Sequence, residues 1–160
     1  MENHKNNRIQ TPIGELFATI SEKGIERLDF NQIHKLESFS LIENEIFSNL
    51  KKQLSEYFSG QRKAFHLPIH LKGTEFQLRV WNQLMEIPYG KTISYKMQSL
   101  ELQNHKAIRA IATANAKNPI MVIVPCHRVI GSDGRLSGYA GGIQAKEWLL
   151  NLEQNQTRLF

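Results

Sequence analysis

The chain has 160 residues, of which 41% are hydrophobic, and a formal net charge of +5. This length predicts one compact domain or two small lobes with a substantial core. No apolar stretch is long enough to cross a bilayer, and the polar residues 1–8 lack the apolar core of a signal peptide. We therefore expect a soluble protein in a reducing compartment, whose positive charge serves either a polyanionic partner or solubility alone.

The first elements along the chain predict a small α/β lobe. Residues 13–20 and 25–30 are typical of strands, and the turn between them predicts a hairpin. Residues 43–58 place apolar side chains at helical spacing, with Gly60 as a C-cap. Residues 68–73 are predicted to form an irregular connection between lobes.

The next elements are predominantly helical. Thr74 is a predicted N-cap of a helix that ends before residues 88–90, and Ser94 is a predicted cap of the following helix. The third helix covers residues 105–117. Its spacing predicts one side with Ile108, Ile111 and Ala112 and another side with Arg109, Thr113 and Lys117. Two helices joined by a short turn, the second small and basic, indicate a helix-turn-helix.

The last part of the chain combines a short strand, a loop and a helix. Residues 120–124 are predicted to be a buried strand that leads into Pro125 and Cys126. The glycine-rich residues 131–142 predict a loop, and residues 146–153 predict an amphipathic helix.

Cys126 is the only cysteine, so it cannot form an intrachain disulfide. It is either a small buried hydrophobe or a reactive thiol. The neighbouring His127 and Arg128 favour the thiolate, which is the nucleophilic form.

Several motifs occur together around this cysteine. Pro125-Cys126-His127-Arg128-Val129 is followed by Ser137-Gly138-Tyr139-Ala140-Gly141-Gly142 and Lys146-Glu147-Trp148-Leu149-Leu150. Upstream lie Gly73-Thr74-Glu75-Phe76-Gln77, Ile87-Pro88-Tyr89-Gly90, Ile93-Ser94-Tyr95 and Ala107-Ile108-Arg109-Ala110. In order and spacing this set resembles the O6-alkylguanine-DNA alkyltransferases over residues 73–153, and residues 11–14 and 54–60 extend the likeness more loosely.

The resemblance implies an α/β fold with two lobes. Residues 1–72 would form a small ribonuclease-H-like α/β lobe. Residues 73–160 would form a mainly helical DNA-binding alkyltransferase lobe that contains a winged-helix-like helix-turn-helix.

The resemblance also implies irreversible transfer of an alkyl group from O6 of guanine in duplex DNA to Cys126, once per molecule. His127 would be the general base, through a water, and Glu153 would orient its imidazole. Tyr95 would donate its hydroxyl to N3 of the leaving base. Asn118 would form the turn that ties the recognition helix to the nucleophile.

The substrate base would be flipped out of the duplex, with Arg109 filling the hole from the minor groove. Gly141 would leave room for alkyl groups larger than methyl, and O4-alkylthymine is a further candidate substrate. The other positions that the resemblance assigns to substrate or DNA binding are Val129, Ser132, Tyr139, Ala140, Gln77, Lys96 and Asn104.

Two positions depart from the family pattern, since Gln103 and His105 replace a turn glycine and proline. Residues 1–72 contain no cysteine, which excludes a thiolate zinc site there, and we expect no metal and no cofactor. The expected partner is double-stranded DNA bound with little sequence specificity, by a monomer that does not bind membranes. The expected location is the cytoplasm, with the nucleoid in a bacterium or the nucleus in a eukaryote.

Three alternatives remain open. A non-catalytic alkyltransferase-like protein would bind the lesion without repairing it, but such relatives lack the cysteine. A helix-turn-helix regulator with a structural thiol would not need the Cys-His pair, Tyr95 and the distant acid. A Cys-His hydrolase would leave the basic helix and Arg109 unexplained.

Overall fold

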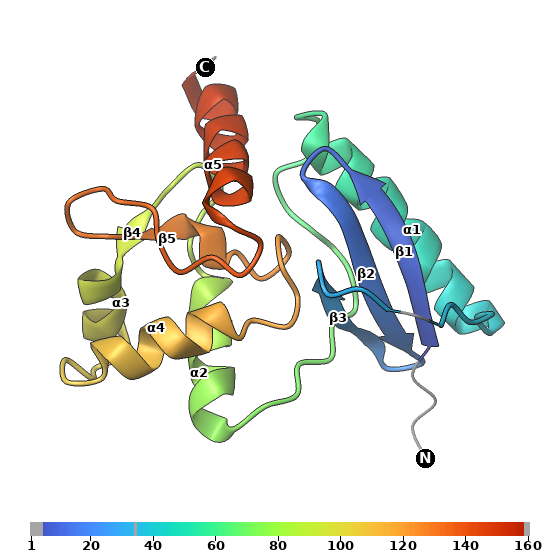
Figure 1. The fold of residues 1–160 in the computed structure, drawn as a ribbon, viewed down its shortest axis with the longest axis horizontal. Coiled ribbons are helices and arrows are strands. Elements are labelled where there is room, and N and C mark those ends of the chain that lie inside the picture. Colours follow the sequence, from blue (N-terminus) through green and yellow to red (C-terminus); the bar gives the residue numbers. More distant parts are fainter. Residues whose placement is uncertain (1–4, 34, 159–160) are drawn as a thin grey trace. The chain divides into compact units, whose positions relative to one another are not determined.

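The computed structural model describes residues 5–33 and 35–158, and the chain divides into two compact units, Met1–Lys72 and Gly73–Phe160 (Figure 1). Each unit has its own core, so each is described by itself. An α/β first unit and a predominantly helical second unit confirm the predicted fold class.

The sheet of the first unit is antiparallel, in the order β1-β2-β3. The strands are β1 (Lys5–Thr11), β2 (Gly14–Ser21) and β3 (Gly24–Asp29), so the predicted hairpin is present as β2 and β3. Strand β1 is an addition that the sequence analysis missed. It is mostly polar, with Ile9 as its buried residue, so it lacks the alternation that identifies a strand.

Helix α1 (Leu41–Phe58) runs along the sheet (Figure 1) and buries Ile46, Leu50 and Leu54. It begins two residues before the predicted start, because Ser40 and Glu43 form a reciprocal capping box. Gly60 follows the C-cap with a φ of 81°, a left-handed conformation that glycine adopts without strain.

Residues 68–73 form the irregular connection that we expected, and one isolated bridge, Ile25 to Ile69, binds them to the edge of the sheet at β3. Ile25 N donates to Pro68 O at 2.9 Å, and His70 N donates to Ile25 O at 2.8 Å. Gly24 permits this approach, since a Cβ atom there would lie 2.7 Å from Pro68 O.

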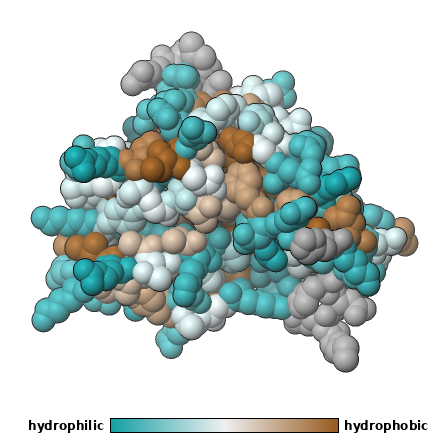
Figure 2. All heavy atoms as spheres, viewed as in Figure 1, coloured by the Kyte–Doolittle hydropathy of each residue, from teal (hydrophilic) through white to brown (hydrophobic). Residues whose placement is uncertain are grey.

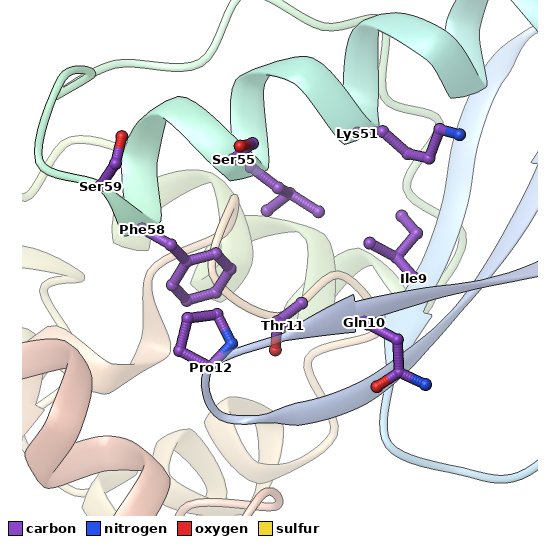
Figure 3. A pocket seen from close by; sticks show the side chains of 9 residues that line it. Ile9, Gln10, Thr11, Pro12, Lys51, Ser55, Phe58 and Ser59 are labelled. Atoms are coloured by element: carbon purple, nitrogen blue, oxygen red, sulfur yellow. The ribbon is translucent and has the colours of Figure 1, made fainter.

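A cavity of about 290 Å³ lies between α1 and the turn that joins β1 and β2. Phe58 of α1 and Pro12 of the turn both line it (Figure 3). No residue that the sequence analysis assigned to chemistry lines this cavity.

The second unit contains four helices and a small parallel sheet within its described residues. The helices are α2 (Glu75–Leu84), α3 (Tyr95–Glu101), α4 (Ile108–Ala116) and α5 (Ile143–Arg158). The sheet pairs β4 (Ile93–Ser94) with β5 (Val129–Ile130), directly after a 3-10 turn, η1 (Cys126–Arg128). This pairing brings Tyr95, the first residue of α3, close to the segment that carries Cys126.

Polar contacts hold α3 and α4 as a helix-turn-helix. Thr74 and Ser94 cap α2 and α3 as predicted, each accepting from a backbone N–H of the first turn. The buried amides of Gln98 and Asn115 donate to each other at 2.9 and 2.7 Å. Gln103 adopts a φ of 56° in the turn, where the family pattern has glycine.

Two predictions in this unit are wrong. Ile108 is 40% exposed, because α4 buries Ile111, Ala114 and Asn115. Residues 121–123 form a turn and not a strand, with Val122 at a φ of 72°. The side chain of Asn118 stabilises this turn, since it accepts from Ile120 N at 3.0 Å and donates to Val124 O at 2.7 Å.

Hydrophilic side chains cover most of the molecular face shown in Figure 2. Exposed large hydrophobic residues include Leu41, Ile143 and Trp148. Within the described ranges, no helix has the length and apolar character required to span a membrane.

Candidate active site

The thiol of Cys126 lies at the start of η1 and is largely buried, with the residue 8% exposed. Asn118 Nδ2 donates to Cys126 Sγ at 3.2 Å and also to the Val124 carbonyl. Because Asn118 follows α4 by two residues, one side chain connects the end of that helix to the sulfur.

Burial raises the pKa of Cys126, while the hydrogen bond from Asn118 and the positive charge of Lys146 lower it in part. This corrects the expectation that adjacent His127 and Arg128 favour the thiolate. Both of those side chains bind Glu153, so the groups that favour the charged sulfur are Asn118 and Lys146.

Glu153 of α5 reaches His127 across a gap of 26 residues, with His127 Nε2 and Glu153 Oε1 at 3.0 Å. Both residues are fully buried. Arg128 holds the same carboxylate through its Nε and Nη2 atoms, at distances of 2.7 to 3.1 Å, and donates Nη1 to Ile87 O. A buried carboxylate between two donors is a fixed anion.

The pKa shifts of Glu153 and His127 indicate which of the two side chains is charged. Burial alone would raise the pKa of Glu153, but hydrogen bonds from His127 and Arg128 and nearby positive charge lower it to about 2. Burial lowers the pKa of His127, which favours the neutral imidazole. Because Nε2 faces a carboxylate, it carries the proton, and Nδ1 has the free lone pair. Nδ1 is buried and has no hydrogen-bond partner in the described part of the chain.

A second group of polar contacts surrounds the Ser137 carbonyl in the loop of residues 131–142. Tyr95 Oη donates to Ser137 O at 3.1 Å. Lys146 Nζ donates to Ser137 O at 2.9 Å and to Val129 O at 2.6 Å. The Lys146 ammonium also lies 5.9 Å from the centre of the Tyr95 ring. Lys146 therefore joins the loop, the small sheet and α3.

The role of Lys146 was not predicted from the sequence, and Arg128 was expected to favour the thiolate and not to bind Glu153. A signal for Lys146 was present, because Lys146, Leu149, Leu150 and Glu153 follow helical spacing and all four are buried. A lysine on the apolar stripe of a helix requires polar partners in the interior.

The residues predicted to bind substrate or DNA have different environments. Val129 and Tyr139 are buried near the thiol, and the charges of Cys126 and Glu153 add to burial in raising the pKa of Tyr139 well above its usual value. Gln77 already serves as the capping partner of Thr74, at 3.0 Å. Arg109, Lys96, Ser132 and Ala140 are exposed, Asn104 and Gly141 are half-buried, and no described contact joins any of these six to Cys126.

The charged side chains in the turn and α4 of the helix-turn-helix are all positive. Residues 102–118 contain Lys106, Arg109 and Lys117 and no aspartate or glutamate. Among the described residues, no group of three or more His, Cys, Asp or Glu side chains has the arrangement of a metal site.

Comparisons with known proteins cover both units. Residues 6–71 match the family described as 6-O-methylguanine DNA methyltransferase, ribonuclease-like domain. Residues 75–155 match the family described as 6-O-methylguanine DNA methyltransferase, DNA binding domain.

Relatives of similar length extend this match. The methylated-DNA--protein-cysteine methyltransferase of Methanosarcina barkeri is 46% identical, over 94% of this chain and 97% of its own. The constitutive methylated-DNA--protein-cysteine methyltransferase of Bacillus subtilis is 43% identical, over 91% and 92%.

A solved structure of Mycobacterium tuberculosis OGT in complex with DNA is similar to this chain, with a TM-score of 0.85 and 39% identity over 94% of this chain and 93% of that one. The solved O6-methylguanine methyltransferase of the same organism has a TM-score of 0.82 and 36% identity, over 96% and 94%. With its thiol, its histidine–glutamate pair and its helix-turn-helix in place, the chain belongs to the 6-O-methylguanine DNA methyltransferase family.

Proposed function

We infer that this chain repairs DNA by direct reversal, taking the alkyl group of O6-alkylguanine onto Cys126. The observation that carries the assignment is the Cys126 thiol, held by Asn118 beside a buried neutral His127 whose second nitrogen is bound by Glu153. A protein that only binds the lesion needs neither the thiol nor the base.

In the proposed reaction, His127 Nδ1 takes the thiol proton through a water. The sulfur attacks the alkyl carbon, so that an S–C bond forms while the C–O6 bond breaks. The electron pair of the broken bond stays on the base, and the proton held by His127 balances that charge. Glu153 stabilises the imidazolium, which would otherwise be a buried unpaired cation.

The departing base needs stabilisation because it gains negative charge. Tyr95 is the donor that we assign to N3 of guanine, where its O–H lowers the barrier as charge develops. The thioether product has no leaving group that a neighbouring side chain can displace. Each molecule therefore acts once.

DNA binding places α4 against the duplex. Arg109 is exposed in the first turn of α4, in a segment that carries only positive charge, and we assign it to fill the hole left by the flipped base from the minor groove. Phosphates would be bound by Lys96, Asn104, Ser132 and the helix end at Gln77.

Around the flipped base, backbone groups of Cys126 and Val129 would contact the edge of guanine, and the backbone N–H of Ala140 would approach O6. Tyr139 would be a further substrate-binding residue. Gly141 leaves space for alkyl groups larger than methyl, and O4-alkylthymine is a second candidate substrate. We assign these reactions to a monomer, in the cytoplasm with the nucleoid or in the nucleus.

Intact-protein mass tests the assignment after mixing with a duplex that carries one O6-methylguanine. The expected result is a gain of about 14 Da that maps to Cys126. The Cys126→Ser variant and an undamaged duplex serve as controls and should show no gain. Tight binding to the lesion without a mass gain would identify a lesion-recognition protein and overturn the proposal.

A further inference from the structure

The hydroxyl of Tyr95 has a partner in the free protein, and this partner conflicts with its assigned role. A phenol carries one O–H hydrogen, so it can donate fully to one acceptor at a time. That hydrogen is directed to Ser137 O at 3.1 Å. To donate to a guanine base, Tyr95 must first give up Ser137.

The Ser137 carbonyl has a second donor that stays when Tyr95 leaves. Lys146 Nζ lies 2.9 Å from Ser137 O and 2.6 Å from Val129 O, and Lys146 is 1% exposed. Ser137 is exposed, but without that ammonium its carbonyl would lose its protein donor when Tyr95 leaves. With the ammonium present, Ser137 O loses the hydrogen bond from Tyr95 and keeps the one from Lys146.

The contacts of Lys146 allow it to hold the loop of residues 131–142 when Tyr95 leaves. Its charge has no carboxylate partner among the described side chains, and its ammonium donates to two backbone carbonyls. These carbonyls belong to β5, three residues after Cys126, and to the loop of residues 131–142. Gly138, next to Ser137, keeps the space open, because a Cβ atom there would lie 3.2 Å from Tyr95 Oη.

We propose that Lys146 is a positioning residue that releases Tyr95 from Ser137 to the lesion base while holding the loop of residues 131–142 in place. The proposal rests on the function assigned above, because the base is what recruits the Tyr95 hydroxyl. In this proposal the Tyr95 hydroxyl donates to Ser137 O in the free protein and to the lesion base during transfer.

A double-mutant cycle of single-turnover methyl transfer tests the coupling, with Tyr95→Phe, Lys146→Met and the double variant. Lys146→Met should slow transfer at least ~10-fold more when Tyr95 is present than in the Tyr95→Phe background. The charge of Lys146 acts on the thiol whether or not the Tyr95 hydroxyl is present. The coupling is therefore measured by the ratio of the two rate losses that Lys146→Met causes, one with Tyr95 and one with Tyr95→Phe. Equal effects in the two backgrounds would overturn the proposal.

Controls separate folding and net charge from the exchange. Lys91→Met removes one exposed charge from the same unit and should not slow transfer. If wild-type protein gains no methyl group, the proposed function has failed. If it does and the ratio is near one, only the role of Lys146 has failed.

A second measurement leaves Lys146 unchanged and decides the matter if Lys146→Met does not fold. The Nζ resonance of Lys146 is followed by NMR in Cys126→Ser, which cannot form the thioether. It should shift with O6-methylguanine duplex and not with undamaged duplex, and Tyr95→Phe in the same background should abolish the shift. A lesion-induced shift of the same size without the hydroxyl would contradict the exchange.

Discussion

At the scale of single residues, Glu153 affects both the orientation and the charge balance of the two side chains that bind it. It is a buried anion between His127 and Arg128, so it orients the imidazole and neutralises the guanidinium together. In our proposal His127 keeps the proton on Nε2 and presents Nδ1 as the base. Glu153 would then act both on the stability of the fold and on the position of the base.

We predict that Glu153→Gln slows methyl transfer and destabilises the fold by about 3–5 kcal/mol, because it leaves Arg128 as a buried cation without its anion. Glu147→Gln, which alters an exposed acid on the same helix, is the matched control and should change neither quantity. Urea unfolding and single-turnover kinetics measure the two effects. Wild-type stability in Glu153→Gln would show that the pair contributes nothing to the fold.

The effect of Glu153→Gln on the free energy of unfolding should also depend on pH. The folded-state pKa of Glu153 is about 2, below its ordinary value of 4.5, so its contribution to stability is complete above pH 4.5 and is lost as the pH falls toward 2. This difference corresponds to about 3 kcal/mol. The gap in unfolding free energy between wild type and Glu153→Gln should therefore narrow across this pH range. A gap that does not depend on pH would contradict the low pKa.

Arg109 is the residue on which base flipping depends in our proposal. Arg109→Ala should lower the rate of methyl transfer from duplex DNA by about 10- to 100-fold, since an unfilled hole in the stack costs a few kcal/mol. Arg8→Ala removes an exposed arginine from the first unit and is the charge-matched control. If both variants lose the same amount, Arg109 contributes only net charge.

The helix-turn-helix shows how elements are locked together. Gln98 and Asn115 exchange two hydrogen bonds in the interior, and Trp81 Nε1 of α2 donates to Ala114 O at 2.9 Å. These contacts fix α3 and α4 against α2 in one register. Apolar packing alone would permit several registers, because α4 is rich in alanine.

We predict that Asn115→Ala costs about 2–3 kcal/mol of unfolding free energy, because it leaves the Gln98 amide buried without a partner. The double variant Gln98→Leu and Asn115→Leu should recover part of this loss, since no polar group then remains buried. Asn151→Ala, at an exposed position of α5, should be neutral. A double variant less stable than the sum of its single changes would refute this account.

The turn between α3 and α4 contains a strained residue. Gln103 has a φ of 56°, which disfavours side chains with a Cβ atom. Gln103→Gly should therefore raise the unfolding free energy by about 0.5 kcal/mol, after allowing for the flexibility that glycine adds to the unfolded chain. Gln103→Val should lower it by about 1 kcal/mol, because a β-branched residue tolerates this φ less well. Thermal melts that rank glycine below glutamine would contradict the strain.

At the scale of the whole molecule, one methyl group can affect the entire second unit. Cys126 is 8% exposed, and its sulfur is hydrogen-bonded to Asn118, which stabilises the turn after α4. Additional volume at the sulfur presses on that turn, and overpacking in a core costs about 1–3 kcal/mol. Repair and loss of stability would therefore be linked.

We predict that the methylated protein melts about 2–12 °C below the unmodified protein. Calorimetry after removal of the DNA measures the difference. Cys126→Ser protein carried through the same treatment should not change. A methylated sample that melts at or above the unmodified temperature would show that the turn accommodates the group.

Local signals in the sequence determined much of this protein. Thr74 and Ser94 marked helix starts because a side-chain oxygen at an N-cap satisfies a backbone N–H whatever the tertiary context. Residues 13–20 and 25–30 predicted a hairpin because two segments typical of strands flank a short turn. The motif set around Cys126 predicted the family and the α/β fold, which the comparisons confirm.

Only the tertiary structure decided the features that depend on distant partners. Strand β1 is polar and is formed by pairing with β2, and the turn at Val122 depends on the Asn118 side chain. In the sequence Arg128 lies two residues after Cys126, but in the fold it binds Glu153. A carboxylate stabilises a buried guanidinium more than a thiol can. Lys146 joins Ser137 and Val129 for the same physical reason, since a buried charge binds whatever acceptors the fold brings to it.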